Sequence, residues 1–235
     1  MVDVRVVLVG VEGAVNLGVI ARTCVNFGVK ELYLVNPVAS LDEALRYSAR
    51  GRELLSNAVI VDNLEKALEG VDVSAATSAI GFSSGDVIRQ AISITDFVKQ
   101  LAFKAGKIAL IFGRESTGLT REELLKADFL VTIPANPDYP VLNISQAVAI
   151  FLWEIWRRMG LKTPNIPPRA SREDVEKVLR VLKDVTSLVV PSEDKVRRCN
   201  IVLRRLVYKS LPSVYEVKVL LYWARRVERR VRITQ

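Results

Sequence analysis

The chain contains no histidine, only two cysteines, and no apolar run as long as the roughly 18 residues of a membrane-spanning helix. Without histidine, Ser-His and Cys-His catalysis are excluded, and a transition-metal site would depend on carboxylates alone, so we expect no metal. Cys24 and Cys199 have no CxxC partner, which predicts core-filling thiols. The first residues read as a strand, VRVVLVG, and not as a signal peptide, so we expect a cytoplasmic protein.

Positive charge is concentrated in the last third of the chain. The formal net charge of +8 over 235 residues divides into −2 for residues 1–161 and +10 for residues 162–235. A nearly neutral body with a basic appendage indicates a polyanionic partner, and nucleic acid fits best. We expect one domain over residues 1–161, a proline-containing linker over residues 162–171, and a small basic all-α appendage over residues 172–235.

Apolar β-branched runs alternate with helical patterns along residues 1–161. The predicted strands are Val4–Val9, Leu32–Val35, Val59–Val61, Val71–Thr77, Ile108–Phe112 and Phe129–Ile133. The predicted helices are a first one capped by Asn16 and ending near Phe27, then Leu41–Tyr47, Arg50–Ala58, Leu64–Leu68, Asp96–Ala105 and Ile144–Met159. The glycine- and serine-rich stretch Gly81–Arg89 reads as a mobile loop. This alternation predicts an α/β fold with a mostly parallel sheet.

Three further helical patterns, near residues 172–189, 193–210 and 213–231, follow the predicted linker. Arginines recur along the last two at helical spacing, which places guanidinium groups on one side of each helix. A merely solvated basic face is the alternative, but a surplus of ten positive charges favours contacts with phosphates. The predicted RNA-binding residues of the appendage are Arg197, Arg198, Arg204, Arg205, Arg225, Arg226 and Arg229.

The stretch Lys107–Thr120, KIALIFGRESTGLT, combines a buried strand, a polar turn bounded by glycines, and the start of a helix. Thr120 and Glu123 have the spacing of a capping box, which predicts a helix that begins after Thr120. Backbone N–H groups at such a turn could bind an anion or a nucleotide. An ordinary loop between a strand and a helix is the alternative interpretation, because short turns of this kind are weak motifs.

Three segments together resemble a known family. NLGVIAR at residues 16–22 with Asn26-Phe27-Gly28, IFGRESTGL at residues 111–119, and residues 133–148 from Ile133-Pro134 to LNISQAV are similar to the three motifs of the SpoU/TrmH branch of SPOUT methyltransferases. The resemblance covers about residues 3–160. The IPANPDYP segment and the helices after the linker more specifically resemble the TrmJ-like tRNA 2′-O-methyltransferases.

This resemblance implies a SPOUT fold, in which a parallel sheet ends in a deep trefoil knot and supports a homodimer. It also implies that S-adenosylmethionine binds in the loops Thr77–Gly81, Phe112–Gly118 and Ile133–Ser145. Glycine-rich turns allow the backbone to approach a ligand closely, and apolar residues can flank an adenine. The implied cofactor-binding residues are Thr77, Ser78, Ala79, Gly81, Phe112, Gly113, Arg114, Glu115, Gly118, Ile133, Pro134, Leu142, Asn143 and Ser145.

The implied reaction is methyl transfer to a ribose 2′-hydroxyl, most specifically in tRNA at the first nucleotide of the anticodon loop. By resemblance, Arg22 is essential and positioned by Asn16, Glu115 and Arg114 pair or orient the second motif and the substrate, and Asn143 organises the third. A neutral guanidine at pH 7 would cost about 7 kcal/mol, so Arg22 could instead hold a substrate phosphate and stabilise the alkoxide. Arg22 and Arg114 are then also RNA contacts. The identity of the proton acceptor stays open.

Three alternatives stay open on the sequence alone. The chain could methylate ribosomal RNA, or it could be a non-catalytic RNA-binding module that has kept the fold. A dinucleotide-binding enzyme fits poorly, because the first strand is followed by GVEG and not by GxGxxG. One departure from the family pattern is Val141, where many relatives have a serine directly before Leu-Asn; Ser145 is a candidate to serve nearby.

Overall fold

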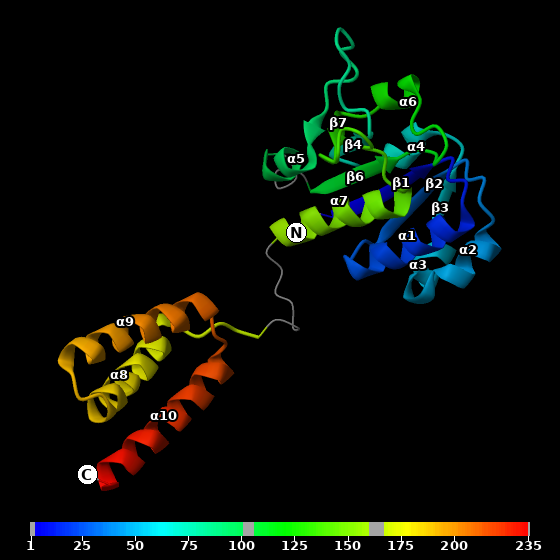
Figure 1. Ribbon diagram of the computed structural model, residues 1–235. Coiled ribbons are helices and arrows are strands. Elements are labelled where there is room, and N and C mark those ends of the chain that lie inside the picture. Colours follow the sequence, from blue (N-terminus) through cyan, green and yellow to red (C-terminus); the bar gives the residue numbers. More distant parts are fainter. Residues whose placement is uncertain (1–2, 101–105, 160–166, 235) are drawn as a thin grey trace. The chain divides into compact units, whose positions relative to one another are not determined.

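Seven strands form a single sheet in the first part of the chain (Figure 1). The computed structural model describes residues 3–100, 106–159 and 167–234, and its contacts divide the chain into two units, Met1–Leu161 and Lys162–Gln235. The strands are β1 (Asp3–Val9), β2 (Glu31–Val35), β3 (Val59–Val61), β4 (Val73–Thr77), β5 (Ile92–Ser93), β6 (Lys107–Phe112) and β7 (Phe129–Thr132). They lie in the order β3-β2-β1-β6-β4-β7-β5, and every registered pair is parallel. The predicted α/β class with a parallel sheet is confirmed.

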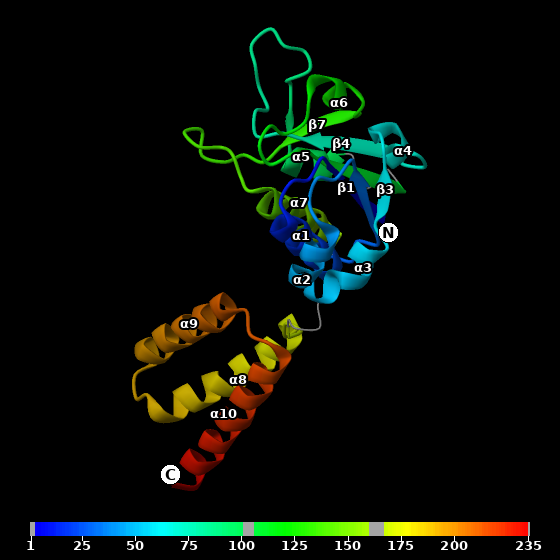
Figure 2. The same cartoon turned by 90° about the vertical axis from the view of Figure 1, so that its right-hand side faces the viewer.

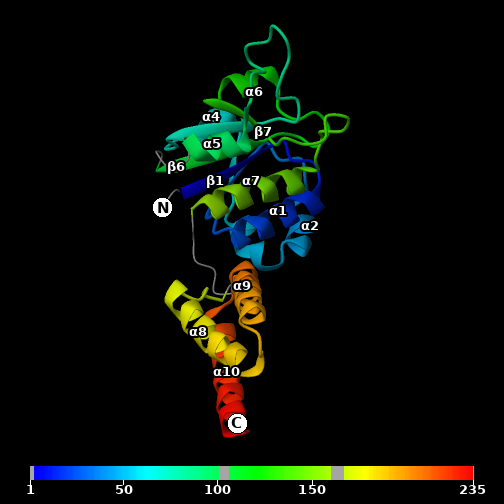
Figure 3. The same ribbon diagram turned by 60° about the vertical axis from the view of Figure 1, so that its left-hand side comes forward.

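Helices cover both faces of this sheet, as Figures 1 and 3 show. They are α1 (Ala14–Asn26), α2 (Leu41–Tyr47), the 3₁₀ turn η1 (Ala49–Gly51), α3 (Arg52–Ser56), α4 (Leu64–Leu68), α5 (Ile94–Gln100), α6 (Arg121–Leu125) and α7 (Ile144–Arg158). One core cluster joins α1, α5 and α7 to the sheet, and a second joins α4 and α6 to its other face. β1 and β6 are apolar along almost their whole length because both of their faces are covered.

Polar groups at the amino ends of the strands are used for structure. Arg5 is 4% exposed, and its guanidinium donates to Glu31 Oε2 at 2.6 Å and to the carbonyl oxygens of Ala67 and Glu69 at 2.7 and 2.8 Å. Lys107 binds the other oxygen of Glu31. A buried guanidinium with such partners is satisfied internally. The loops at the opposite, carboxyl ends of the strands are where ligands bind in open parallel sheets.

Several sequence predictions need correction. Asn16 is not a helix cap, because α1 begins at Ala14 with Gly13 at the cap position. The two-residue strand β5 was not predicted at all. The helix predicted over Asp96–Ala105 begins at Ile94, and its residues 101–105 lie outside the described part of the chain. Burial raises the pKa of the Cys24 thiol to about 12, in keeping with a core residue, whereas Cys199 is exposed.

In the second unit, the described residues 167–234 form the helices α8 (Arg172–Val189), α9 (Glu193–Ser210) and α10 (Val214–Thr234). Side chains of α8 and α10 form its core, whereas α9 has no fully buried residue. Within the predicted linker, residues 162–166 lie outside the described part of the chain. Arg169 and Ala170 pair with the turn between α9 and α10, where the amide of Ala170 donates to Pro212 O at 2.9 Å. No helix among the described residues combines the length and apolarity that crossing a bilayer requires.

Candidate active site

The three sequence motifs meet at the carboxyl ends of neighbouring strands. Asn16 lies in the first turn of α1 after β1, Glu115 follows β6, and Asn143 is the N-cap of α7 after β7. β1 and β6 are adjacent, and β4 separates β6 from β7. Because parallel strands end at one edge of the sheet, segments more than a hundred residues apart reach the same place.

Glu115 connects the second motif to the first. Its carboxylate accepts hydrogen bonds from the amides of Glu12 and Gly13 at 2.9 and 3.0 Å, and from Asn16 Nδ2 at 3.0 Å. Burial alone would raise the pKa of Glu115, but the hydrogen bonds from the Glu12 amide and the Asn16 side chain lower it below its usual range. Glu115 is therefore an ionised acceptor that positions the start of α1, where a negative charge also interacts favourably with the helix dipole.

Asn16 and Asn143 connect the first motif to the third. Asn143 Nδ2 donates to Asn16 Oδ1 at 3.1 Å, and Asn143 Oδ1 accepts from the Ser145 amide at 2.9 Å and the Ser145 hydroxyl at 2.7 Å. Each of the two side-chain amides therefore donates to a residue of one motif and accepts from a residue of another. A continuous path of hydrogen bonds, Glu115–Asn16–Asn143–Ser145, holds the three motifs together.

Arg114 pairs with Glu123 and not with Glu115. Its two terminal nitrogens lie 3.1 Å from the two carboxylate oxygens of Glu123, and this ion pair raises the pKa of Arg114. Glu123 also accepts from the amide of Thr120, and Thr120 Oγ1 accepts from the amide of Glu123, so the predicted capping box is confirmed. Arg114 therefore anchors the loop to α6, while its contact with RNA stays a prediction.

The loop between β6 and α6 requires glycine at both of its ends. Reciprocal backbone hydrogen bonds join Arg114 and Gly118, and Gly118 has a φ of +71°. A Cβ on Gly113 would lie 2.2 Å from the carbonyl carbon of Gly118, which no side chain can tolerate. Glu12 holds the tip of the loop by accepting from the Ser116 amide at 3.1 Å and the Ser116 hydroxyl at 2.7 Å. No local pattern in the sequence predicted this contact across 104 residues.

Arg22 is exposed on α1, six residues after Asn16 and therefore about 9 Å further along the helix axis. The Asn16 side chain is hydrogen-bonded to Glu115 and Asn143 and not to Arg22, so its positioning of Arg22 stays a prediction. Val15, Val19 and Arg22 follow one another at i, i+4 and i+7, so Arg22 continues an exposed apolar stripe.

The three loops predicted to bind a cofactor are adjacent. Thr77 Oγ1 donates to Ile111 O at 3.0 Å and the amide of Ser78 donates to Val131 O at 3.2 Å, so the end of β4 is tied to β6 and β7. Ile133 and Leu142 are both partly exposed where the third loop leaves the sheet and reaches α7. Backbone groups beside half-exposed apolar residues suit a ligand with an adenine and a polar tail.

The sequence that forms this site matches a known protein family. Residues 3–153 match the model of the SpoU rRNA Methylase family. The chain belongs to this family.

Relatives of this SpoU chain match it over nearly its full length. It is 40% identical to the tRNA (cytidine-2′-O-)-methyltransferase TrmJ of Sulfolobus acidocaldarius, over 95% of this chain and 93% of the relative. It is 35% identical to the protein of the same name from Methanocaldococcus jannaschii, over 94% of this chain and 98% of the relative. The crystal structure of TrmJ from Z. mobilis superposes with a TM-score of 0.64 at 21% identity, covering 95% of this chain and 98% of that chain, which supports the fold.

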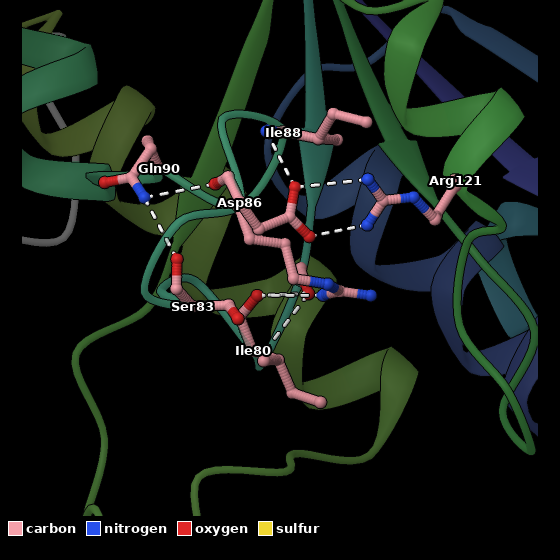
Figure 4. Close-up of polar contacts among 8 residues, drawn as sticks. Ile80, Ser83, Asp86, Ile88, Gln90 and Arg121 are labelled. Atoms are coloured by element: carbon pink, nitrogen blue, oxygen red, sulfur yellow. Dashed lines mark hydrogen bonds and ion pairs between the residues drawn. The ribbon is translucent and has the colours of Figure 1, made fainter.

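The β4–β5 loop of this SpoU chain is closed by its own hydrogen bonds, and Figure 2 shows it reaching beyond the sheet. Gln90 Nε2 donates to the carbonyl oxygens of Ser83 and Asp86 at 3.2 and 3.1 Å. Arg121, the first residue of α6, donates two hydrogen bonds to Asp86 at 2.5 and 3.2 Å (Figure 4). The Arg121 guanidinium also lowers the pKa of Asp86. Residues expected to form a mobile loop are thus attached to the helix that follows the second motif; their mobility stays a prediction.

The arginines of the helical unit differ in what they contact. Both terminal nitrogens of Arg204 bind Glu176 of α8, at 3.0 and 2.7 Å, and Tyr208 donates to the same carboxylate at 2.7 Å. Arg198 forms an ion pair with Asp194 at 2.7 Å. Arg204 therefore joins α9 to α8, although it is exposed, as are the other predicted RNA-binding arginines, Arg197, Arg198, Arg205, Arg225, Arg226 and Arg229.

The helical unit contains a hollow that is separate from the three motifs. An open hollow of about 740 Å³ between α8 and α9 is lined by Lys183 and Arg197 among others, but by no residue of the three motifs, so it does not mark the active site. Among the described residues, no three acidic or cysteine side chains come together as metal ligands.

Proposed function

We propose that this chain transfers a methyl group from S-adenosylmethionine to the ribose 2′-oxygen of a tRNA nucleotide, at the first position of the anticodon loop. The observation that carries this proposal is the path Glu115–Asn16–Asn143, which unites the three SpoU motifs at one edge of the sheet. Relatives of near-equal length that are 35% and 40% identical bear names of tRNA cytidine-2′-O-methyltransferases. The basic helical unit agrees with an RNA substrate.

The residues at this edge fit the proposed cofactor. Thr77–Gly81, Phe112–Gly118 and Ile133–Ser145 would hold S-adenosylmethionine, which supplies an electrophilic methyl group when bound. Ile133 and Leu142 would flank the adenine, and backbone groups of the glycine-containing turns would bind the polar tail. Glu115 and Asn143 keep these loops in register by the hydrogen bonds described above.

Arg22 orients the substrate and stabilises charge in this proposal. Its guanidinium binds a substrate phosphate and the oxygen that becomes an alkoxide, a role that needs no neutral arginine. The hydroxyl proton leaves to a substrate phosphate oxygen or to water. The exposure of Arg22 on α1 supports a role toward a bound molecule.

Incubating an unmodified tRNA transcript with isotopically labelled S-adenosylmethionine tests the proposal. We expect one alkali-resistant linkage per tRNA, at the first nucleotide of the anticodon loop. Transfer to ribosomal RNA and not to tRNA would favour the activity that the family description names. Calorimetry with the cofactor separates a third case, because a non-catalytic RNA-binding module would release no heat of cofactor binding.

Two finer features belong to the same proposal. The sheet order agrees with a trefoil knot, because β6 and β7 pair with opposite edges of the earlier strand β4; an experimental trace of the whole first unit would decide this. The exposed stripe Val15, Val19 and Arg22 on α1, together with Trp153 (52% exposed) on the neighbouring α7, supports a homodimer. Sedimentation of the parent chain and of Val19→Asp tests the dimer, and a monomeric parent would contradict it.

A further inference from the structure

Helix α10 exposes a row of large side chains on the side opposite the one it buries. Val217 and Ala224 are 3% and 0% exposed and pack with Leu220 and Leu221 into the core of the helical unit. On the other side, Tyr215, Val219, Tyr222 and Trp223 are 75%, 48%, 62% and 54% exposed. A rotation of about 100° per residue puts the first three on one stripe, with Trp223 at its edge.

Arginines extend the same stripe toward the end of the helix. The guanidinium carbon of Arg226 lies 5.4 Å from the centre of the Tyr222 ring, within cation–π range. Arg229 is exposed one turn further along. Glu228 lies on the far side of α10 and pairs with Arg232, and Glu216, in the first turn, accepts from the Ser213 amide. From Tyr222 onward the face therefore combines aromatic rings with positive charge.

This chemistry selects one kind of occupant. A contact with a second copy would bring together two helical units that each carry a net charge of +10, which costs electrostatic energy. A fully paired RNA helix would offer phosphates to Arg226 and Arg229 but no base faces to the rings. Unpaired nucleotides satisfy both groups, because bases stack on aromatic side chains while the phosphates contact arginines.

We propose that this α10 face, defined by Tyr215, Tyr222, Trp223, Arg226 and Arg229, binds unpaired nucleotides of the RNA substrate. Bases stack on the three aromatic rings, and the two arginines contact the adjoining phosphates. The proposal rests on the proposed function for the identity of the substrate, and it assigns to the helical unit the task of holding a single-stranded region. No sequence pattern had singled out the aromatic residues.

Stacking and phosphate contacts respond differently to salt, and this difference provides the test. Binding of the full-length chain to a tRNA transcript, to oligouridylate and to an RNA duplex is measured at several salt concentrations. Tyr222→Ala and Trp223→Ala should each weaken binding to tRNA and oligouridylate by roughly 5- to 100-fold, the loss expected for one stacked base, with the salt dependence unchanged. Arg229→Gln should weaken binding and reduce the slope of log affinity against log salt by about 0.7 to 1.

Matched variants separate stacking from general effects. Tyr222→Phe keeps the ring and should bind as the parent does, whereas Leu206→Ala removes a 59% exposed side chain of α9 that has no assigned role and should leave binding unchanged. If Tyr222→Ala fails to fold, Tyr215→Ala and the salt slope of Arg229→Gln decide instead.

RNA binding and tRNA methylation, measured together, distinguish failure of this inference from failure of the proposed function. Unchanged binding by Tyr222→Ala and Trp223→Ala, in a parent that methylates tRNA, would overturn this inference and leave the function intact. Loss of binding in both variants, in a parent that methylates no RNA, would support the inference and overturn the function. A change in the sedimentation of Tyr222→Ala would make the face a protein interface and also overturn the inference.

Discussion

Asn16 and Asn143 are 127 residues apart in the sequence, yet their side-chain amides share a hydrogen bond of 3.1 Å. The bond joins the first turn of α1 to the N-cap of α7. Because Asn16 also donates to Glu115, it lies at the centre of the connection among the three motifs.

Asn143→Asp separates the capping role of Asn143 from its contact with Asn16. Aspartate caps a helix as well as asparagine does, so the free energy of unfolding should change by less than about 0.5 kcal/mol. The variant cannot donate to Asn16 Oδ1, and we expect kcat/KM for methyl transfer to fall about tenfold, equivalent to about 1.4 kcal/mol. Thermal unfolding and tRNA methylation measure the two effects, with Asn143→Ala as the variant that loses both. Full activity of Asn143→Asp would show that the link is not needed.

Arg22→Ala should lower turnover by about 100- to 1,000-fold while cofactor binding is kept. Removing one group that stabilises developing negative charge typically costs about 100- to 1,000-fold in rate. Single-turnover methylation of tRNA measures the rate, and calorimetry with S-adenosylmethionine measures the binding. Arg22→Lys keeps the charge but not the paired donors, so it should recover only part of the rate. A rate near that of the parent for Arg22→Ala would remove the role assigned to this residue.

The ion pair between Asp86 and Arg121 should hold the β4–β5 loop in place. Breaking it with Asp86→Asn or Arg121→Gln should speed hydrogen exchange at the amides of Ser83, Ile88 and Arg89, because the loop keeps only its internal hydrogen bonds. The exchanged pair Asp86→Arg with Arg121→Asp should restore part of the protection. Equal exchange in all four proteins would mean that the internal hydrogen bonds alone order the loop.

Acid should loosen the helical unit through Glu176. The Arg204 and Tyr208 side chains lower the pKa of Glu176 to about 2, from an ordinary value of 4.5. A lowered pKa means that the contribution to stability is complete above about 4.5 and is lost as the pH falls toward 2. Helix content followed by circular dichroism should thus fall over this range in the parent chain. Glu176→Gln lacks this carboxylate and should show a smaller change with pH; an identical acid transition in both would contradict the assignment.

Much of the fold followed from local patterns. The apolar runs of β1 and β6 are buried on both faces of the sheet, which leaves little ambiguity about their being strands. The helices α2, α4, α8 and α9 have the predicted bounds, and side-chain caps fix the start of the first three. The strand β5 was not predicted because two residues are too few to show an alternation of apolar and polar side chains. Only their pairing with β7 makes them a strand.

The start of α1 shows why local signals can fail. Asn16 has the residue type of a cap, but the helix begins two residues earlier, where the Glu115 carboxylate holds the amide of Gly13. Glu115 follows another strand and lies 102 residues away in the sequence, so no local pattern near Asn16 indicates this contact. Nor did the sequence indicate that Arg204 binds Glu176 on a neighbouring helix, while its contact with RNA stays a prediction.

The sequence by itself determined the class of fold, the basic appendage, the capping box and the three motifs that identify the family. Only the tertiary structure decided that Glu115 binds Asn16, that Arg114 binds Glu123, and that the aromatic residues of α10 face outward. The physical reason is that residue type and spacing set local backbone conformation, whereas side-chain partners depend on which strands and helices become neighbours. In this chain the adjacency of β1 and β6 brings Glu115 to Asn16 across 99 residues.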